Sequence, residues 1–257
     1  MRLMLWLLLL PWTAAAWPAR AEPSRLDSVL TRQVLRIGTT GDYRPFSELD
    51  KATGDYSGFD IDMGRSLAAA LGVKVEFIKT TWANLAGNLS SGMFDIAMGG
   101  VSVTLDRQKT GFFSAPYLRD GKTPIARCAE ADKFQTLEEI DRPGVKVIVN
   151  PGGGNERFDR ARLQAAEIIV HPDNLTIFDE LANGRADLMI TDASETRFQQ
   201  KLHPGVLCAV HPDRPFDFAE KAYWMAPDPA LKAFVDQWLH LAIEDGEFDR
   251  LYAKWLR

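Results

Sequence analysis

The sequence Ala-Asp-Leu-Met-Ile-Thr-Asp-Ala-Ser-Glu at residues 186–195 joins a short apolar run to a polar helix start. A short apolar run with polar residues on both sides is typical of a strand buried inside a parallel sheet. The residues that follow it predict a helix, with Asp192 as its N-cap and Glu195 three residues further on. A buried strand that leads directly into a helix indicates an α/β fold.

The two carboxylates of this segment admit two interpretations. In the first, Asp192 and Glu195 form a capping box, and both stay ionised beside the helix dipole. In the second, both face a ligand cleft, where burial and mutual repulsion raise one pKa until that carboxyl can donate a proton. The spacing alone favours the capping box, because such pairs are common at helix starts. The surrounding sequence, described below, favours the cleft.

The composition indicates a globular protein with a large core. The chain has 257 residues, a formal net charge of −5 and 46% hydrophobic residues, which is enough for one large or two modest domains. Nucleic-acid-binding domains usually carry an excess of basic residues. We therefore expect no nucleic-acid partner.

The N-terminal segment has the features of a secretory signal peptide. Arg2 precedes an apolar run at residues 3–10, and small residues follow up to an A-x-A-like site at residues 19–21. A membrane anchor is the alternative, but the run is shorter than the ~20 residues that span a bilayer, and Pro11 and Pro18 interrupt it. We expect residues 1–21 to be removed, a mature protein that starts at Glu22, a periplasmic location and no membrane contact after cleavage.

The mature chain contains two cysteines, Cys128 and Cys208. Paired cysteines of an exported protein usually form a disulfide, and this one would close a loop of 80 residues (208 − 128), which is worth about 4 kcal/mol by loop entropy. The alternative is two buried thiols that only pack. No metal site is expected, because the histidines fall at no metal-ligand spacing: His171, His203, His211 and His240.

The first half of the mature chain predicts strands alternating with helices. Expected strands are residues 35–39, 73–78 and 94–98, and expected helices are 26–34, 58–71 and 83–91. This alternation indicates a mostly parallel sheet with ligands at the carboxyl ends of its strands. The loops expected at that edge contain Tyr43, Trp82 and Ser102.

Arg107 follows a segment rich in hydroxyl groups, Val101-Ser102-Val103-Thr104. A guanidinium close to backbone N–H groups at a helix start is suited to binding a carboxylate in a bidentate manner. The alternative is an exposed charge on a helix. The glycines and aromatic residues of the neighbouring loops favour the carboxylate site.

The pattern starts again after residue 124. A strand is expected at 145–149, a glycine turn at 150–156, a helix at 157–166, a strand at 167–170 and a helix at 175–183. Backbone N–H groups of the glycine turn could hold an anion, but no Lys-Ser or Lys-Thr pair follows, so the turn is not a P-loop. We expect a first lobe of residues 22–123 and 218–257, into which residues 124–217 are inserted as a second lobe.

Several motifs together resemble the periplasmic amino-acid-binding proteins that serve ABC transporters. They are Gly58-Phe59-Asp60, the segment 104–107, Phe113-Ser114-x-Pro116-Tyr117, the glycine turn and Thr191-Asp192-Ala193. The resemblance covers essentially the whole mature chain. It implies the two-lobed periplasmic binding protein fold (type II), in which each lobe is a mostly parallel sheet flanked by helices.

Within that superfamily the chain is similar to the periplasmic cyclohexadienyl dehydratases. The segments that carry this similarity are 40–47, 117–125, 150–156, 171–174 and 215–223. The similarity implies an enzyme that converts prephenate to phenylpyruvate and arogenate to phenylalanine, a carbon–oxygen lyase without a cofactor. These enzymes use the binding-protein fold for catalysis.

The similarity also implies roles for individual residues. Glu195 corresponds to the general acid, Asn150 and Trp82 to residues that contact the substrate, and Arg107 to the arginine that binds the ligand carboxylate. The full candidate substrate-binding set is Arg107, Asn150, Trp82, Asp192, Ser102, Tyr43, Lys122 and Gly153. The chain departs from the dehydratases at one position of the glycine turn. It has Gly154 where they have a threonine, so the threonine hydroxyl is missing here.

Two other functions remain as alternatives to the enzyme. The first is a non-catalytic receptor for a transporter, in which Asp192 binds the ammonium of an amino acid and Glu195 only caps the helix. The second, a sensor domain of a larger receptor, has less support, because no membrane-spanning segment follows the second lobe. A small-molecule ligand is expected in each case, and the chain is compatible with a homo-oligomer.

Overall fold

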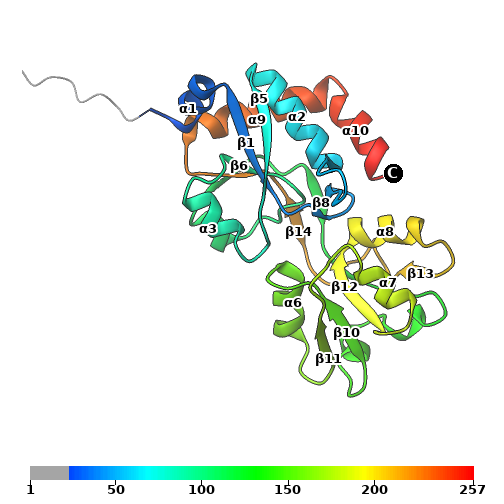
Figure 1. Ribbon diagram of the computed structural model, residues 1–257. Helices are drawn as coiled ribbons and strands as arrows, with labels where there is room; N and C mark the ends of the chain where they lie inside the picture. The colour runs from blue at the N-terminus through cyan, green and yellow to red at the C-terminus, as the bar shows by residue number, and fades with distance from the viewer. Residues whose placement is uncertain (1–22) are drawn as a thin grey trace, which may run out of the picture.

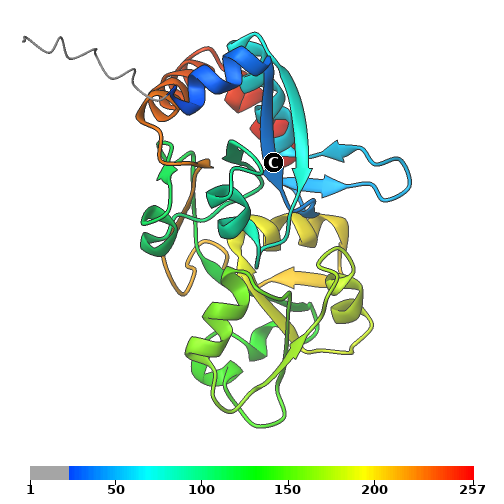
Figure 2. The same cartoon turned by 60° about the vertical axis from the view of Figure 1, so that its left-hand side comes forward.

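Two lobes, each built around a five-stranded sheet, lie one above the other in the computed structural model (Figures 1 and 2). The structure describes residues 23–257. The predicted signal peptide at residues 1–21 and the mature start at Glu22 lie outside this range. The α/β class and the two mostly parallel sheets predicted from the sequence are confirmed.

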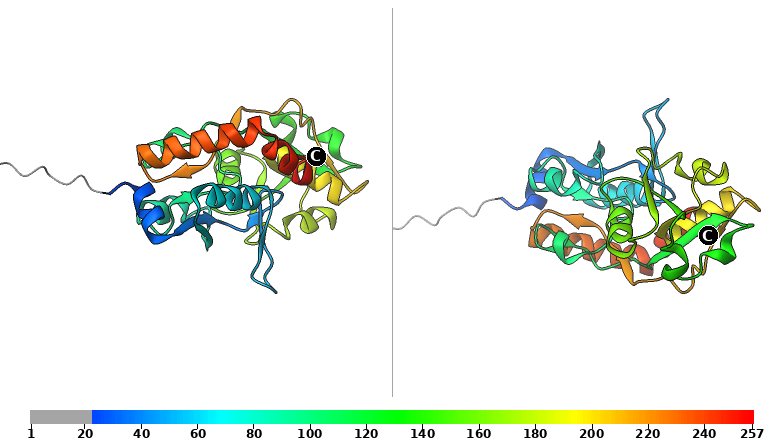
Figure 3. Two further views of the ribbon diagram at one scale, coloured as in Figure 1. Left: turned by 90° about the horizontal axis from the view of Figure 1, so that it is seen from above. Right: turned by 90° about the horizontal axis from the view of Figure 1, so that it is seen from below.

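The first sheet has the strand order β5-β1-β6-β15-β7. Its strands are Lys74–Lys79 (β5), Val34–Thr39 (β1), Ile96–Ala97 (β6), Trp224–Met225 (β15) and Phe112–Phe113 (β7). β1 pairs in parallel with β5 and β6, and β15 pairs antiparallel with β6 and β7. The helices of this lobe are α1 (Arg25–Arg32), α2 (Phe59–Leu71), α3 (Leu85–Ser90), α4 (Leu105–Gln108), α9 (Pro229–Glu244) and α10 (Glu247–Trp255), and Figure 3 shows α2 and α9 side by side.

The second sheet has the strand order β11-β10-β12-β9-β13. Its strands are Glu167–Val170 (β11), Lys146–Val149 (β10), Leu188–Asp192 (β12), Lys122–Arg127 (β9) and Leu207–Ala209 (β13). β10, β11 and β12 run in parallel, and β9 is antiparallel to both of its neighbours. The helices of this lobe are α5 (Leu137–Ile140), α6 (Gly154–Arg162), α7 (Ile177–Ala182) and α8 (Ala193–Leu202), with a short 3-10 helix at Ala131–Lys133.

A two-stranded ribbon links the lobes. Its strands are Leu118–Asp120 (β8) and Ala219–Lys221 (β14), which pair antiparallel. The next strand after β8 is β9 of the second sheet, and the next strand after β14 is β15 of the first sheet. A further small sheet, Asp42–Tyr43 (β2), Ser47–Leu49 (β3) and Tyr56–Ser57 (β4), projects from the first lobe (Figure 2).

The apolar run before Thr191 forms the centre of the second sheet, as predicted. Met189 packs with the α7 side chains on one face, and Leu188 and Ile190 pack with Ile140 and Leu163 on the other. The three β12 side chains are fully buried. A strand covered on both faces has no need of polar alternation, which explains its continuous apolar sequence.

One helix prediction was displaced. The helix expected at residues 157–166 is α6, Gly154–Arg162, which begins inside the glycine turn. The helix ends early because Asp141, which precedes it by more than ten residues, accepts hydrogen bonds at Oδ1 from the backbone N–H groups of residues 164–166 at 2.8, 2.6 and 3.0 Å. Those N–H groups are therefore held outside the helix.

The predicted disulfide is confirmed. Cys128 follows β9, Cys208 lies in the adjacent β13, and the two Cα atoms are 4.8 Å apart. The bond therefore fastens the edge strand of the second sheet to its neighbour. Among the helices of residues 23–257, none has both the length and the apolar character required to cross a membrane.

Candidate active site

A cleft of about 290 Å³ lies where the carboxyl ends of the strands of both sheets meet. All eight residues of the predicted substrate-binding set line it: Arg107, Asn150, Trp82, Asp192, Ser102, Tyr43, Lys122 and Gly153. Tyr43 follows β1, Asn150 follows β10, and Asp192 ends β12. The sheets thus bring together side chains that are up to 149 residues apart in the chain. Glu195, the predicted acid, is not among the lining residues.

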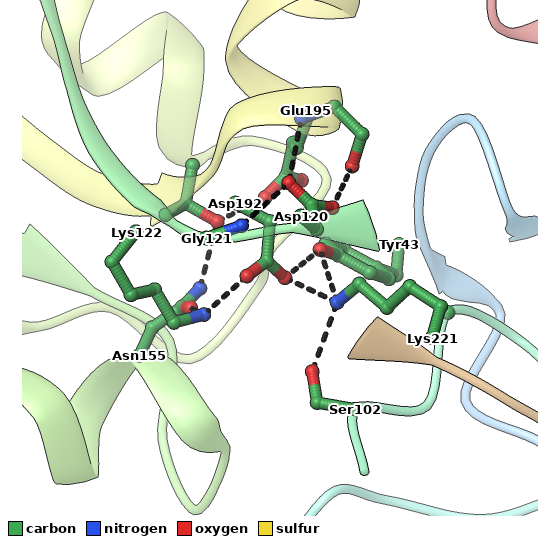
Figure 4. A network of polar contacts seen from close by, with 12 residues as sticks. Tyr43, Ser102, Asp120, Gly121, Lys122, Asn155, Asp192, Glu195 and Lys221 are labelled. Atoms are coloured by element: carbon green, nitrogen blue, oxygen red, sulfur yellow. Dashed lines mark hydrogen bonds and ion pairs between the residues drawn. The ribbon is translucent and has the colours of Figure 1, made fainter. Parts of the chain in front are cut away.

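Asp192 is at the centre of a buried polar network (Figure 4). Its Oδ1 accepts a hydrogen bond from Lys122 Nζ at 2.7 Å, and its Oδ2 accepts one from Lys221 Nζ at 2.5 Å. Tyr43 also donates its hydroxyl to Oδ2. Burial acts to raise the pKa of Asp192, but the two ammonium groups outweigh it and hold this pKa well below its usual range. Asp192 is therefore a carboxylate whose two oxygens both accept hydrogen bonds, one at Oδ1 and two at Oδ2.

The capping box, the interpretation of Asp192 and Glu195 that the spacing alone favoured, is not formed. Asp192 is the N-cap of α8, but its side chain accepts no hydrogen bond from the first turn. Asp120 takes that role from β8, because its carboxylate accepts from the backbone N–H of Ser194 at 3.2 Å and from the Ser194 hydroxyl at 2.5 Å. The sequence pair could not reveal a cap supplied 74 residues away.

Glu195 lies in the first turn of α8 with only 1% of its surface exposed. Its Oε2 accepts a hydrogen bond from Thr191 Oγ1 at 2.5 Å. Burial is the main cause that raises the pKa of Glu195 to about 8, the charge of Asp192 acts in the same direction, and the Thr191 hydroxyl opposes it. At neutral pH the side chain is therefore a neutral carboxylic acid that can donate a proton.

Asn155, in the first turn of α6, connects the parts of this network. Its side-chain oxygen accepts from Lys122 Nζ, and its Nδ2 donates to Asn150 Oδ1 at 3.2 Å and to Thr191 Oγ1 at 3.0 Å. Thr191 in turn donates to Glu195. The Asn155 side chain therefore connects Lys122 and Asn150 with Glu195 through hydrogen bonds.

Arg107 supplies a cation on the opposite wall. Its guanidinium donates to the Ser102 carbonyl at 2.8 Å and lies over the Trp224 ring, 5.9 Å from the ring centre. Burial and the charge of Arg157 lower the pKa of Arg107 to about 10, so it remains protonated at neutral pH. The remaining guanidinium donors can bind a carboxylate in the cleft.

Residues 35–257 match the family model of bacterial extracellular solute-binding proteins, family 3.

The chain belongs to this family.

Its relatives include an enzyme. The cyclohexadienyl dehydratase of Pseudomonas aeruginosa is 55% identical to this chain over 237 residues. The match covers 92% of this chain and 88% of that enzyme. The chain is 28% identical over 237 residues to a probable histidine-binding protein of Neisseria gonorrhoeae, with 87% of this chain and 83% of that one covered. The similarity to cyclohexadienyl dehydratases predicted from the sequence is thereby confirmed.

Solved structures give the same relationship. An ancestral amino acid-binding protein, titled a precursor of cyclohexadienyl dehydratase, superposes with a TM-score of 0.83 at 38% identity and covers 91% of this chain and 100% of its own. An ancestral cyclohexadienyl dehydratase superposes with a TM-score of 0.58 at 52% identity, with 92% and 98% covered. The two-lobed type II fold predicted from the sequence is confirmed by the family and by these neighbours.

Sequence reasoning missed several residues of this family 3 cleft. Three of them matter most. Lys221 donates to Asp192, and Asn155 donates to Thr191. Arg157 adds a second guanidinium to the cleft lining. Lys221 carried one signal, since it directly precedes the apolar run at residues 222–226, which contains β15. A lysine at the start of a buried segment needs a charged partner if it is buried too. Within residues 23–257, no three His, Cys, Asp or Glu side chains gather closely enough to hold a metal ion.

Proposed function

We propose that this chain is a periplasmic cyclohexadienyl dehydratase, a carbon–oxygen lyase that acts on prephenate and arogenate. The observation that carries the proposal is a buried, neutral Glu195 behind a cleft lined with cationic side chains. The 55% identity to an enzyme of that name supports it. Export is inferred from residues 1–21, and it agrees with the extracellular family.

The reaction needs one proton and one electron pair. Prephenate and arogenate carry a ring hydroxyl opposite a ring carboxylate. Glu195 protonates the hydroxyl, which leaves as water, while the carboxylate leaves as carbon dioxide and the electrons of its bond complete the aromatic ring. A proton from solvent then restores the acid. No oxidant, reductant or cofactor enters this balance.

The cleft residues orient the substrate in this scheme. Arg107 and Arg157 bind the side-chain carboxylate, which stays in the product, and leave the departing carboxylate poorly solvated. Asn150 and Trp82 position the ring between the lobes. A positioned acid contributes roughly 100- to 10,000-fold, so orientation and exclusion of water must supply the rest of the rate enhancement.

Glu195 does not line the cleft in this structure. Catalytic hydrogen bonds are often long in an empty site and shorten in the substrate complex. We expect the substrate to draw the Glu195 side chain toward its hydroxyl, with Thr191 as the pivot that the acid now contacts.

The division into lobes is part of the proposal. We infer that residues 22–123 with 218–257, and residues 124–217, move as two bodies about the β8–β14 ribbon. The ribbon is supported as the hinge because it lies between the two sheets in the chain order. Closure of such lobes excludes water from the reaction.

The proposal is tested by incubating the purified protein with prephenate and measuring phenylpyruvate. We expect turnover far above the spontaneous acid-catalysed background at pH 7. A protein that binds prephenate, with a calorimetric signal, but forms no product above background would be a binding protein instead.

A further inference from the structure

Lys122 has one hydrogen-bond donor that no group within residues 23–257 accepts. Its Nζ donates to Asp192 Oδ1 at 2.7 Å and to the side-chain oxygen of Asn155 (Figure 4). An ammonium group has three donors, so one of them is left over. Lys122 lines the cleft, although only 7% of its surface is exposed. The third donor is therefore available to a group that enters the cleft.

Gly154 leaves the space beside this ammonium open. It is the first residue of α6, and it lines the cleft next to Gly153. Outside its own helix backbone and its chain neighbours, a Cβ atom at residue 154 would have one neighbour within 4 Å, the Lys122 Nζ atom at 3.8 Å. The φ angle of Gly154 is not positive, so the backbone does not require a glycine here. The missing side chain therefore shapes the cleft and not the turn.

Arg157 brings a carboxylate close to this space. Gly154 and Arg157 are three residues apart on α6, and both line the cleft. Residues at this spacing are neighbours on one face of a helix. In the reaction proposed above, Arg107 and Arg157 bind the side-chain carboxylate of the substrate. The carbon bonded to that carboxylate carries a ketone oxygen in prephenate and an ammonium group in arogenate, so the group that differs between the two substrates is expected beside Gly154 and Lys122.

We infer that Gly154 is a specificity-determining residue, because it lets the ketone oxygen of prephenate accept the third hydrogen bond of Lys122. The inference rests on the proposed function and deepens it, since it concerns the relative use of its two substrates. Arogenate remains a substrate, because its ammonium group can donate to Asp192 Oδ1, which accepts only from Lys122. Arogenate gains no hydrogen bond from the lysine, however, and the charge of Lys122 repels its ammonium group. Prephenate is therefore the better of the two substrates.

Substitutions at residue 154 test this inference without removing a charge. In Gly154→Ser the hydroxyl is within reach of Lys122 Nζ and accepts its third hydrogen bond, whereas Gly154→Ala only narrows the space. We expect the ratio of kcat/KM for prephenate to kcat/KM for arogenate to fall at least about tenfold in Gly154→Ser, as for the loss of one hydrogen bond from a charged donor. The fall should be smaller in Gly154→Ala.

Gly87→Ala is the matched control. Gly87 lies in α3, its φ angle is not positive, and an added Cβ atom would have nothing within 4 Å. We expect this variant to keep the wild-type ratio of the two kcat/KM values. A fall as large as that of Gly154→Ser would overturn the inference.

A second readout needs no turnover. Phenylpyruvate and L-phenylalanine differ in the same ketone and ammonium groups, and calorimetric titration gives a Kd for each. We expect Gly154→Ser to weaken the binding of phenylpyruvate at least about tenfold and that of L-phenylalanine by no more than about twofold. If the variant weakens both compounds equally, or neither, the inference is overturned. Wild type that forms no phenylpyruvate from prephenate would contradict the proposed reaction, and the two Kd values would still decide the role of Gly154.

Discussion

Glu195 and Asp192 are three residues apart, yet their surroundings give them opposite protonation states. Asp192 faces two ammonium groups and is held as a carboxylate, whereas Glu195 is buried, accepts one hydroxyl hydrogen bond and is held neutral. In many enzymes, two neighbouring carboxyls have different pKa values, so that one of them stays protonated and can act as an acid. The chemistry we propose depends on that separation.

The pH dependence of activity follows from Glu195. Since its pKa in the folded protein is about 8, we expect kcat/KM for prephenate to fall as the pH rises through about 8, where the acid loses its proton. The measurement is a pH–rate profile between pH 6 and 10, values chosen roughly to bracket that pKa. A rate that stays constant up to pH 9 would contradict the role of Glu195 as the acid.

Stability should respond to the same proton. The ordinary pKa of Glu195 is 4.5, and the folded value is about 8, so the folded state binds more protons between these pH values. The free energy of unfolding therefore falls as the pH rises from about 4.5 to about 8. In Glu195→Gln, urea unfolding at a series of pH values should give a flatter profile. An unchanged slope would show that Glu195 is ionised in the folded protein.

Asp159 offers a second test of buried carboxyls. It is fully buried on α6, neither of its oxygens has a hydrogen-bond partner within residues 23–257, and burial raises its pKa to about 8. As for Glu195, the pKa is higher in the folded protein than in the unfolded chain. The free energy of unfolding therefore falls as the pH rises above about 4. We expect Asp159→Asn to be more stable than wild type at pH 8 and similar at pH 4.5 in urea unfolding. A less stable variant at pH 8 would contradict this.

At the scale of elements, α8 depends on a cap from outside its own segment. Asp120→Ala removes the acceptor for the Ser194 N–H and hydroxyl, and we expect it to lower the free energy of unfolding by about 1–2 kcal/mol. Asp106→Ala is the control, because its ion pair with Lys109 is fully exposed to solvent and should contribute little to stability. Urea unfolding measures the free energy of unfolding of both variants. An equal decrease in the two variants would contradict the role of Asp120 as a cap.

The disulfide stabilises the edge of the second sheet. It closes a separation of 80 residues, and removing a bridge of this kind from an exported domain typically costs about 2–5 kcal/mol. We expect Cys128→Ser/Cys208→Ser to unfold at a correspondingly lower urea concentration than oxidised wild type. Wild type kept reduced should match the variant, and a reduced protein as stable as the oxidised one would exclude this role.

The sequence was sufficient for the elements and for most of the cleft. Apolar runs, helix caps and the strand–helix order are local signals, and they predicted β12, α2 and the positions of Arg107, Asn150 and Trp82. Contacts between distant segments were not predictable. The cap from Asp120, the early end of α6 at Asp141 and the pairing of Lys221 with Asp192 each join residues that no local pattern links.

At the scale of the whole molecule, two sheets and a ribbon place the acid and the cationic cleft between two lobes. Relatives with this fold include both binding proteins and a dehydratase, so the fold alone does not decide between them. We propose that the buried, neutral Glu195 is the group that makes this cleft catalytic, because it can provide the proton that the reaction needs.

The most direct test compares wild type and Glu195→Gln with prephenate, measuring binding by calorimetry and phenylpyruvate formation in the same preparations at pH 7. The amide keeps the shape of the acid but has no proton to donate. We expect both proteins to bind prephenate within about threefold of each other, and kcat of the variant to be lower by roughly 100- to 10,000-fold. A folded Glu195→Gln that forms phenylpyruvate as fast as wild type would contradict the account.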